Sequence, residues 1–199
     1  MSEEMLVERE EYLSNGVHIG TKAKHKDMEK YVFHVKKNQL AILDLDQTDE
    51  RIREVASFLS QYDPEEVLVV GRKEAAHKAI ENFAEAVGAE VISGRFMPGT
   101  LTNPQSDSFR EPEVVLVTDP EEDAQAIDEA VDARVPVVSV VDSADSLEDI
   151  DLALPANNKS ENALGLVFFL LAREIAEERA EDFDYQKADF LPESEDDEE

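Results

Sequence analysis

The chain of 199 residues has a hydrophobic fraction of 42%, a formal net charge of −29 and no cysteine. This composition fits one globular domain with a real core and excludes a chain that is disordered throughout. The lack of cysteine excludes disulfides, zinc–thiolate sites and cysteine nucleophiles, and it fits a cytoplasmic protein.

We expect a soluble protein with no membrane partner. The acidic N-terminus lacks the apolar stretch of a signal peptide. The longest apolar run, residues 163–172, has ten residues, which is about half of the roughly 20 needed to span a bilayer.

Three explanations compete for the large negative charge: an acidic tail, an acid-rich binding protein, or adaptation to high salt. The final segment "PESEDDEE" holds six of the 48 acidic residues, so the tail alone does not account for the total. The other acids are spread over the expected helix surfaces, while lysine is scarce at ten. This distribution favours salt adaptation, because concentrated salt shortens charge screening to about 3 Å at 1 M.

In chain order, residues 5–14 read as a short helix that ends at Asn15–Gly16. Two extended runs follow at 31–35 and 40–45, joined by a polar turn. The next helix, within 46–62, places apolar residues from Ile52 to Leu59 on one face. We expect Asp46 or Thr48 to cap it.

From residue 66 onward, short apolar strands alternate with amphipathic helices. The expected strands are 67–70, 90–93, 113–118, 135–141 and 151–155. The expected helices are 73–88, 121–133 and 160–181. Strands that are apolar on both faces belong to a parallel sheet covered on both sides. The fold class is therefore α/β: an open, doubly wound, mostly parallel five-stranded sheet, Rossmann-like or flavodoxin-like, with an N-terminal extension.

This pattern gives three regions. Residues 1–46 form an N-terminal helix and a basic extended segment that pack on the main domain. Residues 47–182 form the α/β domain, and residues 183–199 form an acidic, disordered tail. In such sheets ligands meet the loops at the carboxyl ends of the strands, which here begin at 71, 94, 118, 142 and 155.

Two acids follow strands directly, Asp119 and Asp142. Side by side they could hold Mg²⁺ for phosphoryl transfer. The alternative, which we favour, is that Asp119 before Pro120 starts a turn and Asp142 caps the next segment. No glycine fingerprint accompanies them, and the four histidines, at 18, 25, 34 and 77, match no metal-ligand spacing. We therefore predict no metal, cofactor or small-molecule substrate.

Residues 18–37, the basic segment, contrast with the rest of the chain. Six lysines face two acids there, which gives a net charge of +4 while the remainder carries −33. Tyr31 and Phe33 interleave with the lysines, as expected if bases or riboses pack there. The alternatives are polyanion binding, which we favour, and a solvated face that pairs with acids elsewhere in the fold.

The stretch "GRFMPGTLTNP", residues 94–104, is a stiff loop with two glycines and two prolines. We expect Phe96, Met97 and Leu101 to anchor it on its own sheet. Arg95 offers a bidentate phosphate contact. Further neutral or cationic donors come from this loop and from "PANNK": Thr100, Thr102, Asn103, Asn157, Asn158 and Lys159.

Together, "GVHIGTK", "GRFMPGTLTNP", "VTDP", "LPANNK" and "GLVFFLLARE" resemble the small-subunit ribosomal protein S2 family, known in eukaryotes as the laminin-receptor-like ribosomal protein. The resemblance runs from about residue 12 to 176. The chain length is similar to that of the archaeal branch, and the acidity suggests a haloarchaeon. The resemblance implies a doubly wound fold and a non-enzymatic component of the small ribosomal subunit that binds rRNA and neighbouring ribosomal proteins.

The expected RNA- or partner-binding residues come from the basic segment, the 94–104 loop and the "NNK" motif. They are Thr21, Lys22, Lys24, Lys26, Lys30, Lys36, Lys37, Arg95, Thr100, Thr102, Asn103, Asn157, Asn158 and Lys159. The alternatives are a Mg²⁺-dependent phosphoryl-transfer or nucleotide-handling enzyme using Asp119 and Asp142, and an interaction module that uses its acidic face.

Overall fold

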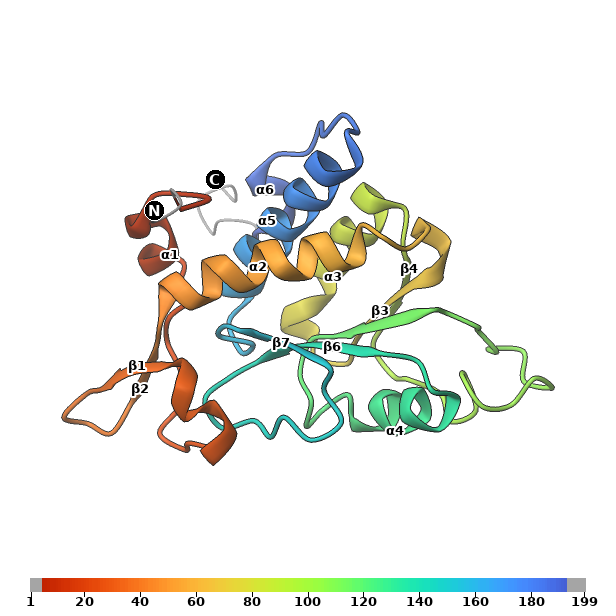
Figure 1. Cartoon of the computed structure of the whole chain (residues 1–199), viewed down its shortest axis with the longest axis horizontal. Coiled ribbons are helices and arrows are strands. Elements are labelled where there is room, and N and C mark those ends of the chain that lie inside the picture. The colour runs from red at the N-terminus through yellow and green to blue at the C-terminus, as the bar shows by residue number, and fades with distance from the viewer. Residues whose placement is uncertain (1–4, 193–199) are drawn as a thin grey trace, which may run out of the picture.

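The computed structural model describes residues 5–192 and has one central sheet (Figure 1). Its five strands are all parallel, in the order β4-β3-β5-β6-β7. They are β3 (Val67–Gly71), β4 (Glu90–Ser93), β5 (Val114–Val117), β6 (Val137–Val141) and β7 (Leu152–Pro155). This confirms the expected α/β class.

Helices cover both faces of the sheet, because alternate strand side chains point to opposite sides. Val67 and Val69 join a core with α2 (Leu45–Leu59), α3 (Glu74–Val87) and α5 (Glu161–Arg179). Leu68 and Val70 point the other way, into a smaller core with α4 (Ala124–Ala133).

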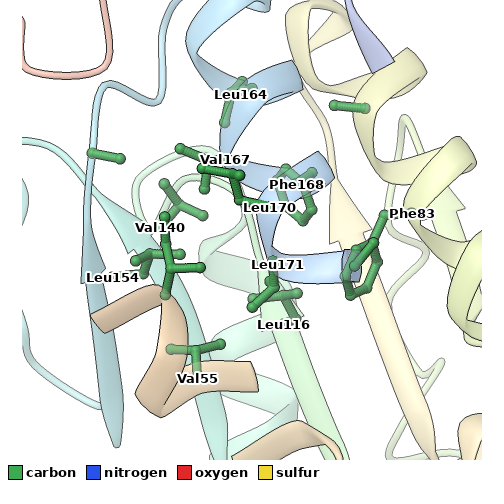
Figure 2. Packing of buried hydrophobic residues seen from close by; sticks show 14 of the residues in the cluster. Val55, Phe83, Leu116, Val140, Leu154, Leu164, Val167, Phe168, Leu170 and Leu171 are labelled. Atoms are coloured by element: carbon green, nitrogen blue, oxygen red, sulfur yellow. The ribbon is translucent and has the colours of Figure 1, made fainter. Parts of the chain in front are cut away.

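Helix α5 lies at the centre of the larger core. Its side chains, labelled from Leu164 to Leu171 in Figure 2, meet Leu116, Val140 and Leu154 of the sheet and Phe83 of α3. Phe83 and Phe168 form an edge-to-face pair with ring centroids 5.4 Å apart. Each fully buried Leu or Phe contributes about 1.5–3 kcal/mol, so this helix holds the domain together. None of the helices of residues 5–192 has the length and apolarity that a bilayer span requires.

Helix α2 begins before the position expected from the sequence. Asp44 is its N-cap and accepts a hydrogen bond of 3.1 Å from the backbone N–H of Asp46. The expected caps, Asp46 and Thr48, are therefore wrong. Thr48 is instead fully buried and donates to the carbonyl of Pro155 at 2.8 Å, which ties α2 to β7.

The N-terminal region lies against the β7 edge of the sheet. It contains α1 (Arg9–Ser14), a 3₁₀ helix over Lys26–Tyr31 and the antiparallel hairpin of β1 (Val32–Val35) and β2 (Ala41–Leu43). The backbone N–H of Asn157 donates to the carbonyl of Val17 at 2.9 Å. The hairpin pairs with neither edge of the central sheet and projects from one end of the molecule (Figure 1).

The expected tail from residue 183 differs from the structure over residues 183–192. Helix α6 (Lys187–Phe190) packs back on α5, and Phe190 is 1% exposed. Gly165 permits this contact, because a Cβ there would lie 2.6 Å from the carbonyl oxygen of Phe190. The remainder of the expected tail, 193–199, lies outside the described residues.

Candidate functional site

The carboxyl ends of the strands bring together a buried carboxylate and two lysines. Asp119, after β5, is fully buried, and its Oδ2 accepts from Lys73 Nζ, after β3, and from Lys159 Nζ, after β7, at 3.5 Å. Its Oδ1 accepts the backbone N–H groups of Glu121 and Glu122 at 3.0 and 3.2 Å. Asp119 therefore starts a turn, as expected, and also links three strand ends.

A second group of buried acids follows β6. Asp142 Oδ1 accepts the backbone N–H of Ser143 at 2.5 Å, and Asp145 Oδ2 accepts the backbone N–H of Asp142 at 2.7 Å. Asp142 Oδ2 has no hydrogen-bond partner among residues 5–192. Burial is the main cause that raises the pKa of both carboxyls, and each also lies near another acid. For Lys159, burial lowers the pKa, but the neighbouring acids Asp119, Asp145 and Asp142, together with a contact to Lys73, raise it overall.

This arrangement does not support the magnesium hypothesis for Asp119 and Asp142. Both oxygens of Asp119 are engaged by turn amides and lysine ammonium groups. Within residues 5–192, no group of three or more His, Asp or Glu side chains is placed to hold a metal ion. The two acids stabilise loops instead.

Ser143, which follows β6, holds residues 20–25 of the basic segment at the end of the sheet. Its Oγ accepts the backbone N–H of Thr21 at 2.9 Å and donates to the carbonyl of Ala23 at 3.1 Å. Its carbonyl accepts the N–H of His25 at 2.8 Å. A Cβ on Gly20 would come within 2.7 Å of the same Oγ, so the glycine allows this close approach. Ser143 thus fixes the path of residues 20–25.

All six lysines of the basic segment are exposed. None forms an ion pair with an acid among residues 5–192, although Lys30 Nζ lies 4.8 Å from the centroid of the Tyr31 ring. The alternative in which the segment pairs with acids elsewhere in the fold therefore lacks support. These residues are Lys22, Lys24, Lys26, Lys30, Lys36 and Lys37.

The two aromatic residues of the basic segment have different positions. Tyr31 is 3% exposed and belongs to a small core with Met28 and Val141. Phe33 is 65% exposed. Only Phe33 is therefore available to a partner.

The 94–104 loop is held by Glu129 of α4, a residue that the sequence reasoning missed. Its carboxylate accepts the backbone N–H groups of Gly99 and Leu101 at 2.7 and 3.0 Å and the hydroxyl of Thr102 at 3.3 Å. Burial raises the pKa of Glu129, but these hydrogen bonds outweigh it and lower the pKa overall. Gly99 has φ of +92°, which glycine adopts without strain.

The apolar anchors of this loop are partly as expected. Phe96 and Leu101 are 7% and 6% exposed and pack against the sheet and α4. Met97 is 50% exposed, so its expected anchoring role is wrong. The loop lies at the end of the molecule opposite the β1–β2 hairpin (Figure 1), so the structure does not bring these two regions together.

Three expected binding residues are buried and hydrogen-bonded within the protein. Thr100 donates to the carbonyl of Met97 at 2.6 Å, Asn157 to the carbonyl of Gly16 at 3.0 Å, and Asn158 to Asp145 at 2.8 Å. The expectation that their side chains face a partner is therefore wrong, because these groups hold loops in place. Arg95, Thr102, Asn103 and Lys159 are exposed.

Two signals in the sequence point to the missed residues. Glu129 lies on the apolar face of its helix, three residues after Ala126 and beside Ala130, and a buried acid there requires donors. Ser143 and Lys73 lie just after apolar strands, in loops already marked as functional. Their specific partners come from distant parts of the chain and leave no local pattern.

The fold and this site define an α/β protein whose strand-end polar groups serve loop structure and whose basic segment carries exposed lysines that form no ion pair with the acids of residues 5–192. Residues 12–108 and 105–178 match the family model of ribosomal protein S2. The chain belongs to the ribosomal protein S2 family, whose members are structural components of the small ribosomal subunit. The match spans the region over which the sequence motifs resemble that family.

Proposed function

We propose that this protein binds small-subunit rRNA through the exposed lysines of the basic segment, and that it contacts neighbouring ribosomal proteins within the subunit. The observation that carries the proposal is the set of six exposed lysines that form no ion pair within the described part of the chain. In a chain of net charge −29, unpaired cations kept on one segment are suited to phosphate groups.

The proposed contacts to RNA or protein are the exposed residues among those expected from the sequence. Thr21, which is half-buried, positions the basic segment through Ser143. Arg95, Thr102 and Asn103 provide a second contact at the other end of the molecule. The surface members of the basic segment and of the strand-end loop are Lys22, Lys24, Lys26, Lys30, Lys36, Lys37 and Lys159.

We further propose that the protein is non-enzymatic and cytoplasmic and that it comes from a haloarchaeon. The charge supports the last point, because 48 acids against 19 lysines and arginines give a surface that repels itself in dilute buffer. Residues 1–46 and 47–182 are proposed as the N-terminal extension and the main domain.

The test exchanges Lys22 and Lys24 for Glu and measures incorporation into small subunits by sedimentation of lysates in multimolar KCl. We expect K22E/K24E to leave the subunit fraction, because two attractive charges become repulsive where phosphates approach. The matched control, K78E/R134E, makes the same change of charge at exposed residues of α3 and the end of α4, and it should incorporate normally.

Both variants must show the circular dichroism of the parent protein. Equal incorporation of K22E/K24E and the control would show that the basic segment is solvated surface. Replacement of Asp119 and Asp142 by Asn tests the enzymatic alternative: a free pool with phosphatase activity that these changes abolish would contradict the proposal.

A further inference from the structure

Phe33 occupies an irregular position in the β1–β2 hairpin. Val32 lies opposite Leu43 and His34 lies opposite Ile42, so two steps along β1 match one step along β2. Phe33 is the additional residue. Such bulges redirect a side chain away from the regular alternation of the strand, and here the redirected side chain is a phenyl ring in solvent.

The exposure of this ring is unusual for this molecule. The chain has nine phenylalanines and four tyrosines, and among those in residues 5–192 Phe33 alone is exposed. A phenyl ring left 65% exposed gives up stabilisation that the core offers to the other aromatic residues. The bulge therefore keeps the Phe33 ring in solvent, a position that the stability of the fold does not require.

The surroundings of the ring favour an anionic partner with a flat, polarisable face. Residues 30–40 contain Lys30, Lys36 and Lys37 and no acid. His34 and Phe33 pack edge-to-face with centroids 5.4 Å apart and an angle of 80° between the rings, so this contact covers at most one face of the phenyl ring. A nucleotide combines a base for the ring with a phosphate for the lysines.

We propose that Phe33 stacks on an unpaired base of the small-subunit rRNA while Lys36 and Lys37 contact the adjoining phosphates. This inference rests on the proposed function and specifies the kind of RNA recognised. Bases inside an RNA duplex are stacked on one another, so a single protruding ring needs a base from a loop, bulge or single strand.

An apolar residue of a neighbouring ribosomal protein is the competing occupant, because Ile19 and Val35 are also partly exposed, at 37% and 43%. The three lysines and the lack of acids in residues 30–40 favour the nucleotide. The experiment distinguishes the two occupants.

The chain has no tryptophan, so Phe33→Trp introduces a single fluorophore at the proposed contact. We expect F33W emission to be quenched when the protein is bound in purified small subunits and to recover after nuclease digestion. Val131→Trp, at a residue of α4 that is 44% exposed and outside the proposed contacts, is the matched control for assembly without this stack. Emission that shifts to shorter wavelength without quenching, and that nuclease leaves unchanged, would overturn the proposal in favour of a protein partner.

A second measurement compares substitutions at Phe33 for binding to isolated small-subunit rRNA in multimolar KCl. Stacking on one base contributes enough that Phe33→Leu should weaken Kd by roughly 5- to 150-fold, while Phe33→Tyr should restore binding. An F33L variant that binds as the parent does, while K22E/K24E does not, would overturn the stacking and leave the proposed function standing. Parental binding by both variants would contradict the proposed function itself.

Discussion

Asp123 combines four hydrogen bonds with a disfavoured charge. Its carboxylate accepts from the backbone N–H groups of Arg72, Thr118 and Asp119 and from the hydroxyl of Thr118. Burial nevertheless raises its pKa from 3.8 to about 6, because loss of water costs more than these bonds return. Asp123 holds the loops after β3 and β5 together, and the free-energy cost of burying its charge depends on pH.

We predict that Asp123 makes the protein less stable as pH rises from about 4 to about 6. Between the two pKa values the folded state binds a proton and the unfolded state does not. The contribution of protonated Asp123 to the unfolding free energy is complete below pH 3.8 and is lost as the pH rises through 6. This contribution totals about 3 kcal/mol.

The measurement is urea unfolding at several pH values for the parent and for Asp123→Asn. The unfolding free energy of the parent minus that of D123N should fall by about 3 kcal/mol from pH 4 to pH 7. Asp128→Asn removes an exposed acid from α4 and is the charge-matched control. A difference that is constant with pH would contradict the assignment.

Glu129 is the second residue whose contacts decide a local structure. We predict that Glu129→Ala loosens the 94–104 loop and destabilises the domain by about 2–4 kcal/mol, because two loop amides lose a charged acceptor. Hydrogen exchange of Gly99 and Leu101 should accelerate, whereas Asp128→Asn should leave it unchanged. Parental exchange in E129A would show that the apolar anchors hold the loop alone.

At the scale of elements, the hydroxyl of Ser143 makes part of the connection between the basic segment and the end of β6, beside the Ser143 carbonyl that accepts from His25. We predict that Ser143→Ala loosens residues 20–25, since the Thr21 N–H loses its acceptor, at a cost of about 1–2 kcal/mol. Exchange of the Thr21 amide should increase, and incorporation into subunits should decrease.

Ser146→Ala is the control for this prediction. Its hydroxyl accepts only from Glu148, within the same loop, so the basic segment should remain in place. Normal incorporation of S143A with a rapidly exchanging Thr21 amide would mean that the partner orders the segment without help from the sheet.

The strands of the central sheet were predictable because they are short, mostly apolar runs, and the helices among them have a clear periodicity. Helix α6 could not be predicted from the sequence. Its short stretch "KADF" does not stand out from the polar, acidic residues around it, and its packing on α5 depends on the lack of a side chain at Gly165. The roles of the site residues were not predictable for the same reason, because contacts between separate parts of the chain decide them. A polar residue type indicates a donor, but whether Asn158 faces solvent or Asp145 depends on a contact between distant loops.

At the scale of the whole molecule, the net charge of −29 makes stability depend on screening. The screening length falls from about 10 Å at 0.1 M salt to about 3 Å at 1 M. The partly buried pairs that the buried carboxylate of Asp119 forms with Lys73 and Lys159 are screened less than fully exposed pairs. Salt should therefore relieve surface repulsion while these internal links persist.

We predict that Tm rises by more than about 10 °C between 0.1 and 2 M KCl, with most of the increase below 1 M. Each kcal/mol corresponds to about 2–4 °C for a chain of this size. Calorimetry provides the measurement, and sucrose at matched osmolality separates screening from a general effect of cosolutes. A Tm that is independent of KCl would contradict the salt adaptation.

The hairpin and the 94–104 loop lie at opposite ends of the molecule, with the central sheet between them (Figure 1). A protein bound at a single site can rotate about that site, whereas a protein bound at two distant sites has its orientation fixed. Under the proposed function, the packed sheet between the two segments would set the separation between the two pieces of RNA that the protein can join. Changes in the length of its strands would alter that separation more than any substitution at either end.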